Sequence, residues 1–139
     1  SLELLLPISK GEMDNPKIFF ALCNVYTKKG YFTVATGHCE KSFGLDKSNY
    51  ETINRLAWLY AKKRINLKKA FELSNQTLKA FPKRAEFIDT LSEILYVQGE
   101  TEKAMAKIKE AITLVPNNPY YKQQLWKFKS VKLKSEPAG

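Results

Sequence analysis

The sequence has few of the residues that most often carry out chemistry. It has a single histidine, His38, and only two cysteines, Cys23 and Cys39, which do not form a CxxC pair. This set is too small and too scattered to supply the ligands of a zinc site. No nucleophile–base pair and no glycine-rich phosphate loop is present either. We therefore expect no catalytic residues, no metal and no cofactor, and we do not expect the protein to be an enzyme.

Long apolar runs are missing as well. No stretch of 18 apolar residues occurs, so the sequence predicts no membrane span. The short run Leu4–Leu6 lacks the basic flank and the length of a signal peptide. These observations favour a cytoplasmic location. The chain begins at Ser1 rather than at methionine, which leaves open that it is a fragment of a longer protein.

Acidic residues are outnumbered, with 14 against 23 basic residues and a net charge of +9. The densest basic run is 62–69, and a second group of lysines lies near the C-terminus. A charged turn or terminal helix most often keeps a protein in solution, although an acidic partner protein is an alternative. Nucleic acid is the least favoured partner, because no aromatic residues are interleaved with the basic ones to stack on bases.

Helical periodicity is the strongest pattern that is present. In 85–118, apolar residues recur every three or four positions, Gly99 interrupts them, and Pro116 ends the second run. The pattern predicts two amphipathic helices of roughly 14 residues each. Two helices of that length cannot bury both apolar faces against each other, so the pair needs neighbours.

The neighbours are copies of the same pattern. Leu22, Leu56, Leu91 and Leu125 follow one another at intervals of 34, 35 and 34 residues. Small residues keep the same register, among them Cys23, Ala57 and Ser92, and again Ala35, Ala70 and Ala104. A helix pair with this period resembles the tetratricopeptide repeat (TPR) family over roughly residues 16–130. The resemblance implies an all-α, right-handed α-solenoid of about three helix-turn-helix repeats with a C-terminal capping helix. The alternative is an ordinary helix bundle whose spacing coincides by chance.

This register divides the chain. We expect a TPR-like domain over 16–130, preceded by an extension or the remnant of an earlier repeat (1–15) and followed by a disordered tail (131–139). Within the domain, the predicted segments are repeat 1 (16–49), repeat 2 (50–84), repeat 3 (85–118) and the capping helix (119–130). Repeat 2 has one extra residue in its turn, 62–66, and Asn66 is expected to cap the helix that follows. Ser48–Glu51 reads as a capping box before repeat 2.

The two cysteines fall on facing helices of repeat 1. We favour two buried, reduced thiols that fill small-residue positions, with a disulfide inside the repeat as the alternative. His38 is expected on the outer helix, away from any groove and in contact with solvent. Val25 is expected in the buried stripe of the first helix.

Functional residues are predicted from the resemblance. In the TPR family, the first helices of successive repeats line a concave groove that binds extended peptides or a partner helix. The same register places the following residues in the groove: Phe20, Asn24, Thr27, Lys28, Asn54, Trp58, Lys62, Asp89, Glu93, Tyr96, Gln123 and Lys127. Trp58 is the expected anchor, because other apolar residues already supply the buried face of its helix. The alternative is that Trp58 packs against the next repeat.

One TPR subfamily clamps the C-terminal carboxylate of chaperones, and this chain departs from its pattern. Only Asn24 matches the clamp, whereas Glu86 and Thr90 stand where a basic pair is required. An acidic residue there, Glu86, would repel a carboxylate ligand, so the clamp is disfavoured. Glu86, Asp89 and Glu93 share one helical face. A solvated acidic face and a binding role are both open for them, whereas acid–base catalysis is not expected, because we expect them to be exposed and to have ordinary pKa values.

These arguments predict a non-catalytic protein–protein interaction scaffold that binds a peptide or protein partner. One alternative is a module that binds anions or nucleic acid through the basic turn 62–69. Another is an accessory domain of a larger enzyme. Self-association through the N-terminal side is also left open.

Overall fold

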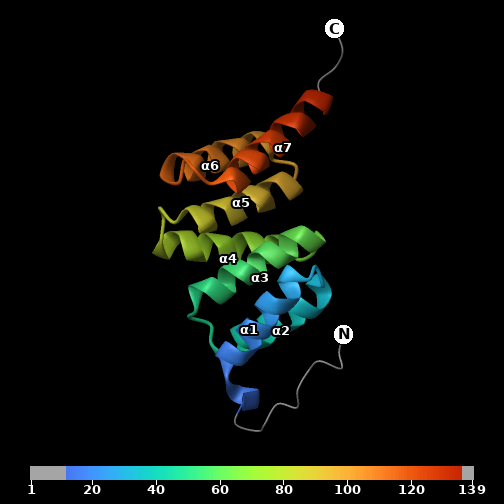
Figure 1. The fold of residues 1–139 in the computed structure, drawn as a ribbon, viewed down its shortest axis with the longest axis vertical. Coiled ribbons are helices and arrows are strands. Elements are labelled where there is room, and N and C mark those ends of the chain that lie inside the picture. Colours follow the sequence, from blue (N-terminus) through green and yellow to red (C-terminus); the bar gives the residue numbers. More distant parts are fainter. Residues whose placement is uncertain (1–11, 136–139) are drawn as a thin grey trace. The chain divides into compact units, whose positions relative to one another are not determined.

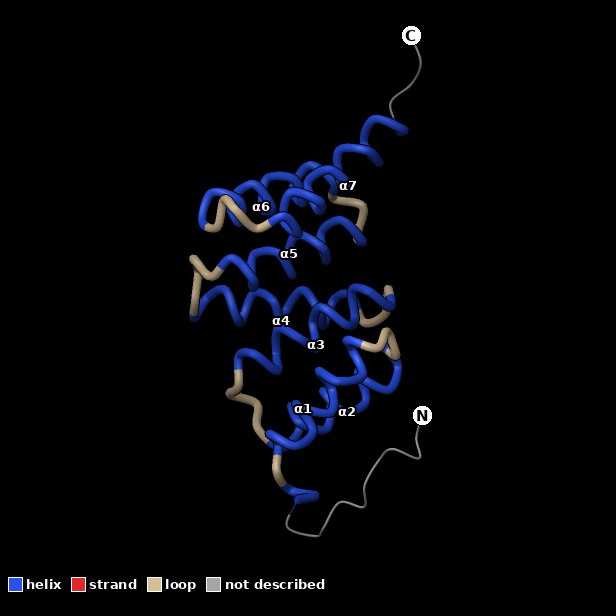
Figure 2. The backbone as a smooth tube through the Cα atoms, in the orientation of Figure 1, coloured by secondary structure: helices blue, strands red, loops and turns tan. Residues whose placement is uncertain are grey.

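The structure is a computed structural model, and it describes residues 12–135. Within this range the chain forms seven α-helices, a short 3-10 helix (Glu12–Asp14) and no strand (Figures 1 and 2). The α-helices are α1 (Pro16–Lys28), α2 (Phe32–Leu45), α3 (Tyr50–Lys63), α4 (Leu67–Ala80), α5 (Ala85–Val97), α6 (Thr101–Leu114) and α7 (Pro119–Ser135). The predicted all-α class is confirmed. None of the described helices is both long enough and apolar enough to span a membrane.

Asparagine side chains start helices α1 and α3. Asn15 precedes Pro16, and its Oδ1 accepts a hydrogen bond from the Lys17 amide at 3.0 Å. Asn49 precedes α3, and its Oδ1 accepts from the amides of Glu51 and Thr52. Each bond satisfies an amide that has no partner inside the helix. The cap of α3 is therefore Asn49, whereas the sequence pattern suggested Ser48.

The turns inside the helix pairs use left-handed backbone. Gly30 and Gly99 have φ values of +81° and +85°, a region that glycine enters without steric cost. In the turn between α3 and α4 the corresponding conformation falls on Arg64, with φ of +57°, and Asn66 follows at +49°. Asn66 directly precedes α4 as predicted, but its side chain makes no capping hydrogen bond. This turn thus places two residues other than glycine in left-handed backbone, a region that asparagine tolerates better than arginine.

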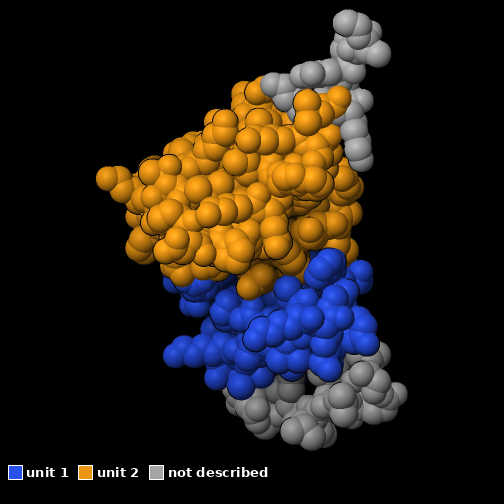
Figure 3. Space-filling view, turned by 45° about the horizontal axis from the view of Figure 1, so that its top comes forward, with its two compact units in different colours: residues 1–52 blue, residues 53–139 orange. Residues whose placement is uncertain are grey.

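The chain divides into two compact units, with the boundary inside α3 after Thr52 (Figure 3). We call residues 1–52 unit 1 and residues 53–139 unit 2. In unit 1, α1 packs against α2 around a small core that includes Phe19, Tyr26 and Ala35. Val25 is exposed, which contradicts its predicted place in the buried stripe.

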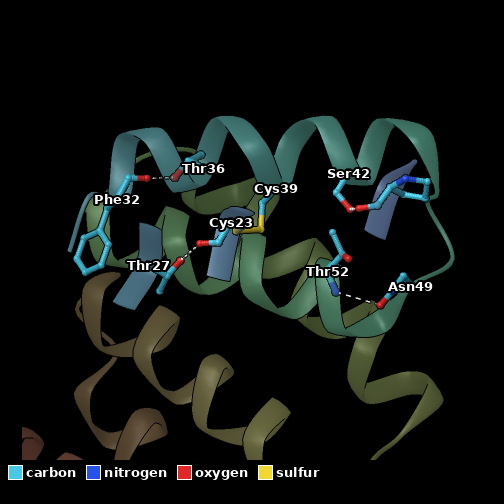
Figure 4. The surroundings of a disulfide bond; sticks show 9 residues. Cys23, Thr27, Phe32, Thr36, Cys39, Ser42, Asn49 and Thr52 are labelled. Carbon is cyan, nitrogen blue, oxygen red and sulfur yellow. Dashed lines mark hydrogen bonds between the residues drawn. A yellow bond between two sulfur atoms is a disulfide. The ribbon is translucent and has the colours of Figure 1, made fainter. Parts of the chain in front are cut away.

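A disulfide joins the two helices of unit 1 (Figure 4). Cys23 of α1 and Cys39 of α2 are bonded, their Cα atoms lie 5.4 Å apart, and neither side chain is accessible to solvent. The prediction of two reduced thiols was wrong. Small residues let the helices approach closely, and the resulting Cα separation is typical of disulfides. Further along α2, the Ser42 hydroxyl donates a hydrogen bond to the Pro16 carbonyl at 2.8 Å.

His38 lies on α2, as predicted, but it is half-buried rather than solvated. Its ring stacks on Tyr26 at 5.6 Å between centroids and on Phe19 at 6.2 Å. Burial lowers the pKa of His38. The histidine therefore belongs to the packing between α1 and α2.

Unit 2 is held by apolar packing. Helix α5 contacts α4 and α6, and α6 contacts α7. The core that joins α5, α6 and α7 includes Ile88, Leu91, Ile108, Tyr121 and Phe128. This packing positions the faces of α3, α5 and α7 that carry the polar residues described below.

Helix α7 is longer than predicted. It continues to Ser135, so residues 131–135, expected in a disordered tail, are helical. Trp126, which the repeat register aligns with the small residues of the other repeats, is 72% exposed. Residues 136–139 lie outside the described residues, and so do residues 1–11, which make up most of the predicted N-terminal extension.

Candidate functional site

A pocket of about 200 Å³ lies in unit 2. Its lining residues come from three helices. They are Asn54, Arg55 and Trp58 of α3, Glu86, Asp89 and Thr90 of α5, and Tyr120 of α7. Both α3 and α5 contribute residues spaced by three or four positions, which lie on one face of a helix. Asn118 caps the start of α7, because its Oδ1 accepts from the Tyr120 amide at 2.9 Å, and this fixes the first turn that carries Tyr120.

Two polar groups of the pocket lining lack partners. Asn54 is only 4% exposed, and its Oδ1 accepts no hydrogen bond. The Nε of Arg55 is buried and donates none, while the guanidinium lies 5.5 Å from the centre of the Trp58 ring. A buried polar group without a partner costs about 1–3 kcal/mol. The pocket therefore presents an acceptor and a donor that a ligand could satisfy.

Asp89 is a buried carboxylate with little compensation. It is 6% exposed, and its Oδ1 accepts one long hydrogen bond, 3.3 Å, from Gln124 Nε2 on α7. Burial raises the pKa of Asp89 to about 7; the bond from Gln124 opposes this, and the charge of Glu93 adds to it. Burial thus favours the protonated form of this carboxyl group more than in an exposed aspartate. Our expectation that Asp89 would be exposed and unshifted was wrong, because α7 covers this face of α5.

Glu93 lies one turn further along α5 and is fully compensated. It is 3% exposed and accepts from Lys127 Nζ at 2.9 Å and from Gln124 Nε2 at 3.1 Å. Lys62 of α3 completes the ion pairs at 3.8 Å. Lys127 also lies 4.8 Å from the centre of the Tyr96 ring. This charged cluster joins the three helices beside the pocket, and Gln124 bridges the two carboxylates.

Aromatic rings form part of the pocket wall. Trp58 is half-buried. Two cationic groups lie near its ring: the Arg55 guanidinium described above, and the Lys62 ammonium at 5.6 Å from the ring centre. Tyr120 stands on α7. Burial raises the pKa of Tyr120, and the charge of Asp89 raises it further. The Tyr120 hydroxyl is therefore neutral at any physiological pH.

The structure brings most of the predicted groove residues of unit 2 together. Asn54, Trp58 and Asp89 line the pocket, and Lys62, Glu93, Tyr96 and Lys127 form or border the charged cluster. Gln123 is the exception, because it is exposed and the neighbouring Gln124 contacts α5 instead. The buried positions Tyr121, Gln124 and Phe128 are spaced as one helical face, and this spacing could have identified Gln124.

The remaining predicted residues lie on α1 in unit 1. Phe20, Asn24 and Thr27 are half-buried and Lys28 is exposed. The Thr27 hydroxyl donates to the Cys23 carbonyl at 2.8 Å, so it is occupied within its own helix. The Oδ1 of Asn24 is buried without a partner. The described residues contain no group of three or more histidine, cysteine or acidic side chains that could hold a metal ion.

Comparisons with known proteins identify the fold. No family model and no curated protein matches the sequence. Solved structures do match: the first TPR domain of Spaghetti (RPAP3) bound to an HSP90 peptide has a TM-score of 0.71 at 16% identity, covering 87% of this chain and 95% of the other. The Sgt2 TPR domain from Aspergillus fumigatus gives 0.72 at 15% identity, with 89% and 85% covered.

A third match is the second TPR domain of human RPAP3 in complex with an HSP70 peptide, with a TM-score of 0.65, 17% identity, and 83% and 98% covered. The chain therefore has the fold of a TPR domain, an all-α solenoid of helix-turn-helix repeats, as the sequence pattern predicted. At these identities the likeness defines the fold, and the ligand has to be argued from the side chains.

Proposed function

We propose that the chain is a non-catalytic protein-interaction module that binds an extended segment of a partner protein. The binding site is the pocket between α3, α5 and α7, together with the charged cluster beside it. The observation that carries this proposal is the position of Trp58. Its ring lines the pocket beside the unpartnered acceptor of Asn54. A large aromatic side chain next to unsatisfied polar groups is typical of an anchor point for a protein partner.

The structural neighbours support this reading. Two of the TPR domains with this fold are described as bound to peptides of HSP90 and HSP70. Here the lining of the pocket includes Glu86 and Asp89, which disfavour the C-terminal carboxylate of an acidic peptide. The partner segment is therefore expected to differ in charge from an acidic tail.

The test uses a displayed library of random peptides that is selected on the immobilised protein. Recovered peptides are then titrated by calorimetry against wild type, Trp58→Ala and the matched control Trp126→Ala, which removes an exposed tryptophan outside the pocket. We expect Trp58→Ala to weaken binding by at least about tenfold, as removal of an interface anchor does. The loss should persist between about 50 and 500 mM salt, because apolar contacts are not screened.

Circular dichroism checks that both variants retain their helices. The proposal fails if no recovered peptide distinguishes Trp58→Ala from Trp126→Ala. If binding instead falls steeply with salt and is lost on replacing Lys63, Arg64, Lys68 and Lys69 by glutamine, the basic turn 62–69 is the binding site.

A further inference from the structure

We infer that the pocket is specific for a basic side chain, the ammonium or guanidinium group of a lysine or arginine in the partner segment. This inference rests on the proposed function and adds the chemistry of the ligand. Its head group would lie between the Asp89 carboxylate and Asn54 Oδ1, and its aliphatic stem would contact the rings of Trp58 and Tyr120.

The first reason is the unpartnered acceptor. Asn54 is almost completely buried, lines the pocket, and its Oδ1 accepts no hydrogen bond. An acceptor is satisfied only by a donor. Lysine offers three N–H donors and arginine five, whereas a carboxylate or phosphate offers none at neutral pH.

The second reason is the difference between the two buried carboxylates of α5. Glu93 has ion pairs to Lys62 and Lys127, and Asp89 has none. Lys127 thus makes its ion pair with Glu93, and Asp89 is left without an ion pair of its own. Of the two carboxylates in the pocket lining, Glu86 pairs with Arg84 at 3.6 Å, so Asp89 is the one that lacks an ion pair. A cation is the ligand that would balance this arrangement.

The third reason is size and shape. The volume of about 200 Å³ is below the roughly 300–1,000 Å³ of sites for small molecules and cofactors, and it suits one long side chain. Lysine and arginine have apolar stems that pack on aromatic surface while the charged head reaches polar partners. Arg55 would bind the backbone of the segment rather than the side chain, because its Nε–H has no partner and can donate to a backbone carbonyl.

The test uses three small probes: the Nα-acetyl methylamides of lysine, norleucine and glutamate. Norleucine keeps an apolar stem and lacks the charge. Binding is followed by NMR at the indole N–H of Trp58. We expect the lysine probe to bind about tenfold or more tightly than the norleucine probe, as for a charged hydrogen bond in a partly buried site, and the glutamate probe not to bind.

Two substitutions locate the cation. Asp89→Asn should weaken the lysine probe by about tenfold, while Glu72→Gln, which removes the same charge from an exposed position of α4, should leave it unchanged within about twofold. Asn54→Leu, which removes the acceptor at nearly constant shape, should also weaken it. Equal binding of lysine and norleucine, or unchanged binding in Asp89→Asn, would overturn the inference.

The two proposals fail separately. If library peptides depend on Trp58 and the lysine probe does not bind, the interaction module stands and the specificity for a basic side chain is wrong. If the lysine probe binds and no library peptide depends on Trp58, the pocket recognises cations and the proposed partner segment is wrong.

Discussion

Repeats 1 and 3 solve the same packing problem with different chemistry. Cys23 and Cys39 of unit 1 occupy the same repeat positions as Ser92 and Ile108 of unit 2, each 69 residues further along the chain. All four side chains are inaccessible to solvent. In unit 1 the crossing helices are joined by a covalent bond, whereas in unit 2 an isoleucine packs in the same place. The repeat fixes where a small residue is needed and leaves open what holds the helices together.

The units also differ in the polar groups that they bury. In unit 1 the buried polar residues among those described are Thr36, Ser42 and Thr52, all of them uncharged, and the hydroxyls of Thr36 and Ser42 donate to backbone carbonyls. In unit 2 two carboxylates, Asp89 and Glu93, are buried on adjacent turns of one helix. Burying a carboxylate is costly and packing does not require it. A costly charged group in a pocket wall is an indication of function rather than of fold.

The largest expected effect comes from removing the disulfide that distinguishes unit 1 from unit 2. Replacing both cysteines, Cys23→Ala with Cys39→Ala, should destabilise unit 1 by about 3 kcal/mol, because the disulfide closes a loop of about 17 residues in the unfolded chain. Hydrogen exchange would show faster exchange of the amides of α1 and α2. The control is Ser92→Ala at the corresponding position of α5. A loss of protection spread evenly over α1–α7 would show that the disulfide is not a local device.

A smaller effect is expected from replacing the buried carboxylate, and this replacement should stabilise the protein rather than destabilise it. The folded state holds the pKa of Asp89 near 7, above its ordinary value of 3.8, so it favours the protonated form. The group therefore costs folding free energy that grows as the pH rises from about 4 to 7 and is complete above that. Asp89→Asn should stabilise the protein by about 1–3 kcal/mol at about pH 8 and by less at about pH 5.

Urea unfolding at the two pH values, with Glu72→Gln as the control, measures this difference. The charged groups that face Asp89 are Glu86 and Glu93 on α5 and Lys127 on α7, with Arg55 in the same pocket. A stability gain that is equal at both pH values would contradict the assignment of the effect to the carboxyl group.

The smallest expected effect concerns the turns. Repeats 1 and 3 use Gly30 and Gly99 in left-handed backbone, whereas repeat 2 places Arg64 there. Arg64→Gly should stabilise unit 2 by about 0.5–1 kcal/mol, because it removes the contact of Cβ with its own backbone. Thermal unfolding measures the gain. Gly99→Ala is the reciprocal control and should destabilise by a similar amount, and a destabilising Arg64→Gly would mean that the Arg64 side chain holds the turn.

Most of the fold could be predicted because the same helix pattern repeats along the sequence at a nearly constant spacing. Helices α1, α3, α5 and α7 begin at 16, 50, 85 and 119, the first residues of the predicted segments. The three pocket residues Asn54, Trp58 and Asp89 were placed correctly on their helices for the same reason. Period fails where the wrong face of a helix is carried over. Helix α7 packs through Tyr121, Gln124 and Phe128, which the 34-residue step aligns with the buried Phe87, Thr90 and Ile94, whereas Gln123 was chosen because it aligns with Asp89.

Burial and bonding were harder to predict than position. Asp89 and Glu93 read as a solvated acidic face because the helix that covers them is distant in sequence. The cysteines read as separate thiols because the distance between them depends on how closely α1 and α2 cross. The chemistry of the partner could not be predicted either, because it depends on which hydrogen-bond acceptors lack a donor in the folded protein. These acceptors can be identified only when the positions of all neighbouring side chains are known.

The disulfide also has a mechanical consequence. A chain that is pulled from its two ends can extend only through residues that lie outside closed covalent loops. The bond between Cys23 and Cys39 removes 16 residue steps from that length, which at about 3.5 Å each amounts to roughly 55 Å of hidden extension. Under load, the oxidised unit 1 would therefore reach a shorter limiting length than the reduced one, whereas unit 2, which holds no disulfide in its described residues, keeps the full extension of its chain.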